Sequence, residues 1–341
     1  MTQVLQEVAV DPELVEGARN AIRVCLRVQP QEKVTLITDA ASIGIAAALA
    51  AEIANVGARY RAWTLEEVAP RPLAEMPRPV LQDLECSDVS IFAAQAQTNE
   101  LHSRMQMTEV VSRRKIRHAH MVNITRQIMR DGMRADFREV DRISLEVIEI
   151  ARAAALVRAR TPAGTDLTAE MNPDYKWLKT SGIISPNTWG NLPGGEIFTT
   201  PGEVNGTFVV DGVVGDYLCA KYGDLHREPL TIRIKRNRLT EAHCANRELE
   251  DEFWRYTHTD ENSDRVGEFA IGTNIGVRDV NGNILQDEKI PGVHIAFGDP
   301  YGAYTGADWR STTHIDVVGR KFDIWADDRI IMRRGAFVLN A

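Results

Sequence analysis

The sequence predicts a mixed fold, with an α/β domain at residues 1–157 and a β-rich α+β domain at residues 158–341. Three observations lead to this prediction. A chain of 341 residues is too long for one ordinary hydrophobic core, which favours two domains. The first half alternates helical sequence with short apolar runs. The second half is rich in Gly, Asn, Thr and Asp and has short β-type runs.

The N-terminal domain is expected to contain a mostly parallel sheet covered by helices. Residues 14–28 have the periodicity of an amphipathic helix, and VTLIT at 34–38 is typical of a buried strand. Asp39 or Ser42 can cap the alanine-rich helix that follows to about residue 55, and Gly57 can end it. Further strands are expected at 59–65, 88–94 and 120–124, with helical sequence between them and up to about 157. Strands joined by helices pair in parallel.

The end of the first strand lacks the usual phosphate-binding motifs. No G-x-G-x-x-G follows it, and G-x-x-x-x-G-K-[ST] is absent from the chain. A dinucleotide or nucleotide phosphate therefore has no cradle of backbone amides here.

The C-terminal domain is expected to be antiparallel and β-rich. Its β-type runs lie at 206–214, 230–235, 269–271, 293–297, 316–318 and 321–325. The pairs Asn281-Gly282 and Asp211-Gly212 are turn signals that suit hairpins. Only residues 247–256 have a convincing helical pattern.

Composition and charge exclude several classes of protein. A net charge of −8 disfavours binding to the phosphate backbone of a nucleic acid. No apolar run is long enough to cross a bilayer, and acidic residues stand at the start where a signal peptide would be basic. The four cysteines form no C-x-x-C pair, which favours reduced thiols. We expect a cytoplasmic protein that binds neither nucleic acid nor membrane.

The clearest chemical signal is His314-Ile315-Asp316. Side chains two apart in a strand project to the same side, so this His and Asp can share a metal ion or a proton. A His hydrogen-bonded to its Asp on a solvated strand is the alternative reading of this pair alone.

Three more residues make a shared cation the better explanation. His294 lies inside an apolar run, and Glu196 and Glu268 each stand beside glycine and precede apolar residues. An unpaired buried carboxylate is costly, so a common cation accounts for these residues better than separate roles do. Two histidines and three carboxylates suit a dinuclear site of zinc, cobalt or manganese. The other histidines are expected to have surface or structural roles.

Ordered motifs between residues 158 and 335 extend this pattern. They are GTDLT at 164–168, NLPGGEIFTTP at 191–201, Gly267-Glu268, His294 in HIAFG, Tyr301, and His314-x-Asp316. Together they resemble the M29 metallo-aminopeptidases, the aminopeptidase T or thermophilic aminopeptidase group. Two features depart from the family: Gly194-Gly195 replaces a more usual polar and acidic pair, and Glu288 stands one residue farther from His294 than the family's corresponding Glu.

The resemblance implies a homodimeric, metal-dependent hydrolase acting on a small peptide or amide. Its two divalent ions would be held by Glu196, Glu268, His294, His314 and Asp316. Glu268 would be the bridging ligand, Glu196 or Glu288 the general base, and Tyr301 a hydrogen-bond donor to the oxyanion.

Two alternatives stay open at this point. The 2,5-dihydroxypyridine dioxygenases resemble the same fold and hold one Fe(II), but their pattern has a His where this chain has Glu268 and lacks the equivalents of Glu196 and His294. The other alternative is a non-catalytic protein that binds a small molecule or peptide on the same scaffold.

Overall fold

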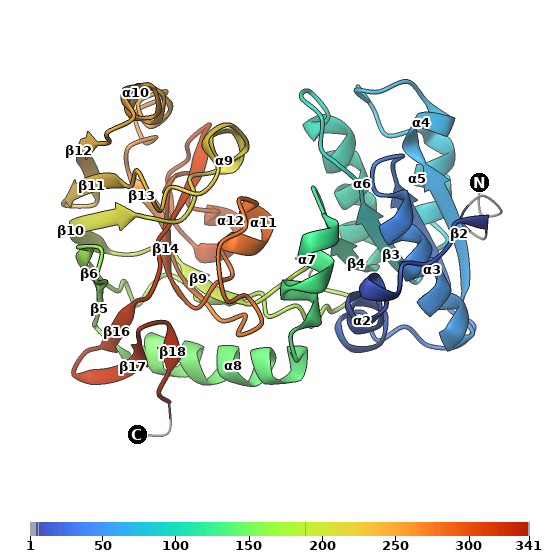
Figure 1. Ribbon diagram of the computed structural model, residues 1–341, viewed down its shortest axis with the longest axis horizontal. Helices are drawn as coiled ribbons and strands as arrows, with labels where there is room; N and C mark the ends of the chain where they lie inside the picture. Colours follow the sequence, from blue (N-terminus) through green and yellow to red (C-terminus); the bar gives the residue numbers. More distant parts are fainter. Residues whose placement is uncertain (1–4, 6, 188, 340–341) are drawn as a thin grey trace. The chain divides into compact units, whose positions relative to one another are not determined.

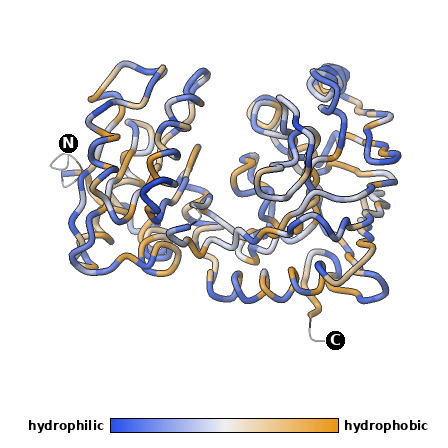
Figure 2. The backbone as a smooth tube through the Cα atoms, turned by 180° about the vertical axis from the view of Figure 1, so that it is seen from behind, coloured by the Kyte–Doolittle hydropathy of each residue, from blue (hydrophilic) through white to orange (hydrophobic). Residues whose placement is uncertain are grey.

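The computed structural model describes residue 5 and residues 7–187 and 189–339, which fold into two compact units (Figure 1). The first unit contains the residues up to Arg138 together with Gly182–Gly194, and the second contains Glu139–Ser181 and the residues from Gly195 onward. The predicted domains had one division, after residue 157. The chain divides earlier because α8 (Phe137–Ala153) packs Val147 into the core of the second unit. Figure 2 shows hydrophilic and hydrophobic residues alternating along α8.

The first unit contains the predicted parallel sheet. Its strand order is β2-β1-β3-β4-β8, and every neighbouring pair is parallel. The strands are β1 (Lys33–Thr38), β2 (Arg59–Thr64), β3 (Val89–Ala93), β4 (Arg117–His120) and β8 (Gly190–Asn191). The helical segments are η1 (Pro12–Leu14), α2 (Val15–Arg19), η2 (Asn20–Cys25), α3 (Ile43–Val56), α4 (Leu65–Val68), α5 (Arg78–Leu84), α6 (Leu101–Arg114), α7 (Arg126–Arg130) and η3 (Gly132–Arg134). The fold class predicted for this half is confirmed.

The strand predicted at residues 120–124 is wrong, because β4 ends at His120. Its sequence is RHAH, which lacks the apolar pattern of a buried strand. His118 is nevertheless fully buried, since its Nδ1 lies 2.8 Å from the hydroxyl of Ser90 on the neighbouring strand. A hydrogen-bonded histidine thus takes a core position that an apolar residue would usually fill.

The second unit contains two antiparallel sheets that share one core. The eight-stranded sheet has the order β12-β11-β10-β6-β5-β16-β17-β18, and the five-stranded sheet has the order β15-β14-β13-β9-β7. Phe208 from the first of these sheets and Phe269 and Phe297 from the second belong to the same cluster of buried side chains. The antiparallel, β-rich character predicted for this half is confirmed.

The bounds of the elements in the second unit are as follows. The larger sheet is formed by β5 (Leu156–Arg160), β6 (Asp166–Glu170), β10 (Glu203–Val210), β11 (Leu230–Lys235), β12 (Arg238–His243), β16 (Asp323–Ala326), β17 (Arg329–Arg333) and β18 (Ala336–Phe337). The smaller is formed by β7 (Leu178–Lys179), β9 (Glu196–Thr199), β13 (Val266–Gly272), β14 (Gly292–Gly298) and β15 (His314–Val318). The helices after α8 are α9 (Asp216–Tyr222), α10 (Arg247–Tyr256), α11 (Ile284–Asp287) and α12 (Gly302–Thr305).

Neither predicted turn signal forms a hairpin. Asn281 and Gly282 stand in a loop before α11, where their backbone N–H groups donate to the carboxylate of Asp287. Gly212 follows β10 and packs on the backbone of β15, where a Cβ would lie 2.5 Å from the carbonyl oxygen of Val318. Close backbone packing and a side-chain anchor thus replace the expected tight turns.

Two further observations bear on the composition. All four cysteines are free, and only Cys86 is exposed. Among the described residues, no helix combines the length and apolar character needed to cross a bilayer.

Candidate metal centre

The register of the five-stranded sheet places Glu268 and Asp316 on one face. Glu268 of β13 lies opposite Ala296 of β14, and Ala296 lies opposite Asp316 of β15. Residues directly opposite each other in a sheet project to the same face. The two carboxylates therefore flank a small alanine side chain that leaves space between them.

The other three predicted ligands share this face. His294 is two residues from Ala296 in β14, His314 lies opposite Gly298, and Glu196 of β9 lies opposite Gly272. Within their strands, His294 is two residues from Ala296, His314 is two residues from Asp316, and Gly272, the partner of Glu196, is four residues from Glu268. Residues an even number apart in a strand project to the same face. Glycine and alanine thus alternate with acidic and histidine side chains on this side of the sheet.

The opposite face of the same strands is apolar. Phe269, Ile295 and Val317 are fully buried in the core of the unit. Their packing fixes the strands, since a slip of one residue would carry all the polar side chains into the core. The alternation of apolar and polar residues that favours these strands thus also places the polar side chains together on one face.

The five side chains lie close together. The Nε2 atom of His294 is 3.5 Å from Glu196 Oε2 and 3.5 Å from Glu268 Oε1. The Nε2 atom of His314 is 3.9 Å from Glu268 Oε2 and 3.6 Å from Asp316 Oδ1. The structure therefore brings together every residue that the sequence proposed as a ligand.

The donor atoms have the surroundings that a cation requires. His294 Nε2 is buried and makes no hydrogen bond, although it faces two carboxylates. The Nδ1 atom of His314 lies 2.9 Å from the carbonyl oxygen of Asp299, so it donates its proton there, and Nε2 is the nitrogen that faces Glu268 and Asp316. Buried imidazole nitrogens and carboxylate oxygens are the donor set of zinc, cobalt or manganese. The residues present therefore fit a divalent ion.

Mutual electrostatics perturb these groups strongly. Burial lowers the pKa of His314, but Asp316 and Glu268 outweigh it and raise that pKa to about 10. Burial raises the pKa of Asp316, but the adjacent His314 outweighs it and the net direction is down. For Glu268 burial prevails, so its pKa is raised. Such opposed shifts in one buried cluster are typical of functional sites.

The loop after α11 adds Glu288 and Lys289 to this cluster. Glu288, a predicted catalytic residue, lies beside two predicted ligands. One donor atom each from Glu288, His294 and Asp316 lie within 4.8 Å of one another. Burial raises the pKa of Glu288 to about 8, against the effect of Lys289. The extra residue between Glu288 and His294 thus does not carry Glu288 away from the site.

Lys289 is the residue that sequence reasoning missed. Its side chain is only 1% exposed, and its Nζ lies 2.7 Å from Glu196 Oε1 and pairs with Glu288 Oε1. Two adjacent residues of opposite charge usually indicate a solvated turn, so the sequence EKIPG gave no signal of burial. The oxygen of Glu196 that faces Lys289 also accepts from the Thr180 hydroxyl at 2.8 Å.

Tyr301 lies at the edge of the centre. Its ring centroid is 4.5 Å from that of His314, and its backbone is in the left-handed region with φ 51°. Such a conformation is costly for a tyrosine, and the bond from its N–H to Asp299 Oδ1 at 2.9 Å helps to hold it. Burial and then the nearby carboxylates of Glu268 and Asp316 raise the pKa of its hydroxyl, which keeps its proton.

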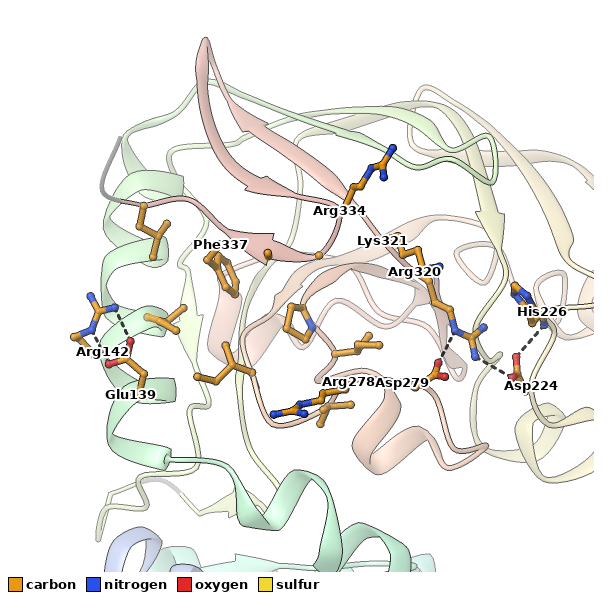
Figure 3. A pocket seen from close by; sticks show the side chains of 18 residues that line it. Glu139, Arg142, Asp224, His226, Arg278, Asp279, Arg320, Lys321, Arg334 and Phe337 are labelled. Atoms are coloured by element: carbon orange, nitrogen blue, oxygen red, sulfur yellow. Dashed lines mark hydrogen bonds and ion pairs between the residues drawn. The ribbon is translucent and has the colours of Figure 1, made fainter.

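A cavity of about 720 Å³ in the same unit is separate from this centre (Figure 3). None of the five predicted ligands lines it. On one side of it, the guanidinium of Arg320 pairs with Asp224 at 2.9 Å and with Asp279 at 3.2 Å. Asp279 lies in the loop between β13 and α11, so the two ion pairs of Arg320 connect that loop to Asp224 in the segment after α9.

Comparison with known proteins gives both a family and two structural neighbours. The model of the thermophilic metalloprotease (M29) family matches residues 145–321. A 2,5-dihydroxypyridine 5,6-dioxygenase of Pseudomonas putida is 26% identical over 200 residues, which are 55% of this chain and 55% of that protein. The aligned part thus spans about half the length of this curated relative.

The two solved structures share the fold over nearly the whole chain. The 2,5-dihydroxypyridine dioxygenase from Pseudomonas putida KT2440 covers 95% of this chain and 96% of its own, with a TM-score of 0.69 and 17% identity. AmpT from Thermus thermophilus covers 96% of this chain and 99% of its own, with a TM-score of 0.67 and 18% identity. The family model matches more than half of the chain, so this chain belongs to the thermophilic metalloprotease (M29) family.

Proposed function

We propose that this protein is an aminopeptidase-like hydrolase that cleaves an N-terminal peptide or amide bond at a centre of two divalent ions. The observation that carries the proposal is the convergence of two histidines and three carboxylates on one sheet face, with the buried Nε2 of His294 making no hydrogen bond. Buried carboxylates gathered around an imidazole are costly without a compensating positive charge, and a bound cation would supply it.

Two overlapping groups of donors support a pair of ions. One consists of Glu196, Glu268 and His294, and the other of Glu288, His294 and Asp316. Glu268 has one oxygen toward each histidine, which suits the bridging role proposed for it from its residue type. Zinc, cobalt and manganese all accept such oxygen and nitrogen donors.

The protein's own groups suit acyl transfer to water. Bound divalent ions would polarise the scissile carbonyl and supply hydroxide near neutral pH. Both oxygens of Glu196 face partners, one toward Thr180 and Lys289 and the other toward His294. Glu288 pairs with Lys289 through one oxygen, so we propose Glu288 as the general base. The protonated hydroxyl of Tyr301 would donate to the oxyanion.

The test combines metal retention with turnover. Purified protein is assayed with zinc, cobalt or manganese against aminoacyl amides and dipeptides. Glu268→Ala and His314→Ala are expected to lose bound metal and activity together, while His243→Ala, an exposed histidine of the same unit with a side chain 69% accessible, keeps both. Full activity in the Glu268 variant would remove the proposal.

A second candidate function is a mononuclear Fe(II) dioxygenase acting on a hydroxylated pyridine. The 26% identity to the Pseudomonas putida enzyme favours it. His294, His314 and Asp316 offer two histidines and one carboxylate, but the dioxygenase pattern has its second His where this chain has Glu268. The additional carboxylates Glu196 and Glu268 favour the hydrolase. Oxygen uptake with Fe(II) and 2,5-dihydroxypyridine, without hydrolysis of any amide, would decide for the dioxygenase.

The resemblance also leads us to propose a homodimer, which sedimentation of the purified protein tests. Elemental analysis addresses the remaining alternative of a non-catalytic binding protein. Absence of any bound transition metal, with no activity on metal addition, would support that alternative.

A further inference from the structure

The candidate ligands of the centre do not have equivalent surroundings. Lys289 Nζ contacts Glu196, a member of one group, and Glu288, a member of the other. The structure gives no ion pair between Lys289 and His314 or Asp316. One side of the centre thus already contains a fixed positive charge.

The backbone holds that charge in place. The carbonyl of Lys289 accepts from the N–H of Asn274 at 3.0 Å, and its own N–H donates to Gln286 at 2.9 Å. Gly272 allows the loop to lie directly on β13, because a Cβ there would be 2.0 Å from the carbonyl oxygen of Ile290. The side chain is 1% exposed, so its ammonium cannot reach water unless the loop moves.

A buried ammonium beside carboxylates competes with a metal cation. It neutralises Glu196 and Glu288, and it repels a divalent ion placed on the same oxygens, most strongly where water is excluded. Glu268, His294, His314 and Asp316 are linked by contacts of 3.5 to 3.9 Å that do not involve the lysine. These four residues therefore offer donor atoms that the ammonium does not contact.

We propose that Lys289 makes the centre unequal: Glu268, His294, His314 and Asp316 bind one divalent ion tightly, and the ammonium occupies the place of a tight second ion at Glu196 and Glu288. This inference rests on the proposed metal function and adds an order of binding to it. The second ion binds weakly, when the ammonium is displaced from its carboxylates.

The test counts metal rather than product. Elemental analysis of the purified protein after gel filtration is expected to find one ion per chain. Calorimetric titration with Zn²⁺ should then show a second ion that binds at least 100-fold more weakly. Lys289→Met, which keeps length and removes charge, should retain two ions per chain. Lys221→Met, a partly exposed lysine paired with Glu248 and Glu252, is the matched control and should behave as the unmodified protein.

Lys289→Gln is the second variant, because it removes the charge and keeps a hydrogen-bond donor for Glu196. Circular dichroism verifies that each variant is folded. Two ions bound with equal affinity by the unmodified protein would overturn the inference, and so would an unchanged single ion in both lysine variants. One tight ion without any hydrolysis would instead refute the hydrolase and leave the role of Lys289 standing.

Discussion

His118 and His120 form a buried pair in the first unit whose charging should destabilise the fold. Nε2 of His118 lies 3.3 Å from Nδ1 of His120, and the ring of His120 stacks on Phe92 with centroids 5.2 Å apart. Burial lowers the pKa of His118 to about 3. Burial, and then the charges of His118 and Arg104, lower the pKa of His120 well below its usual value.

The sign of the pH effect follows from proton linkage. An unfolded histidine binds a proton below a pKa of about 6.5, whereas folded His118 stays neutral down to about pH 3. The neutral His118 therefore contributes its full stability above about pH 6.5, and this contribution is lost as the pH falls from about 6.5 to about 3. Between pH 7.5 and pH 5 the loss is roughly 2 kcal/mol for each such histidine.

Urea denaturation at several pH values measures this dependence. Trp189 contacts both rings, so replacing the other tryptophans by Phe would make the fluorescence report on this pair. His118→Asn, which retains a partner for Ser90, is expected to remove about half of the loss between pH 7.5 and pH 5. The exposed His243→Asn serves as the control with an unchanged slope. If His118→Asn kept the full pH dependence of the unmodified protein, the assignment of a neutral buried pair would be refuted.

Three further predictions follow from single contacts. Gly272→Ala places a methyl group against the Ile290 carbonyl and should cost about 1–3 kcal/mol in urea denaturation, whereas Gly44→Ala, with nothing within 4 Å of its Cβ, should stabilise α3 by up to ~1 kcal/mol. Tyr301→Phe should lower kcat by about 10²–10³-fold without changing metal content; an unchanged kcat in steady-state assays would exclude the oxyanion role. Arg71→Met leaves the buried carboxylates of Asp39 and Glu100 unpaired, and thermal melting should show a loss of about 3–5 kcal/mol; a loss as small as that of the exposed Arg113→Met would contradict this.

Local sequence patterns predicted the helices and strands whose sequence signals lie within the element or directly beside it. Strand β11 alternates apolar and polar residues in LTIRIK, and α10 follows Asn246, whose side chain accepts from the N–H of Leu249 as an N-cap. Both elements have the predicted bounds. Helix α9 was missed because it begins after Gly215 without a side-chain cap and buries only Leu218 and Cys219.

The ligand candidates were recognisable because carboxylates and histidines stood among glycine and apolar residues. Lys289 was not, since its burial depends on a backbone approach across Gly272 that no local pattern records. The division of the chain was also hidden, because residues 182–194 join the first unit through partners distant in sequence, namely β4, Cys25 and Arg27. The identity and number of the ions, the roles of the individual residues, the dimer and the cytoplasmic location stay predictions.

The segment Gly182–Gly194 determines which fragments of the protein can be expressed separately. This segment leaves the unit that bears the donors, adds the edge strand β8 to the parallel sheet, and returns directly before Glu196. A fragment starting at Glu139 would therefore carry that strand without its partner and would expose Ile184 and Leu192, which are buried in the intact chain. Expression of the second unit alone requires that these thirteen residues be replaced by a short hydrophilic bridge.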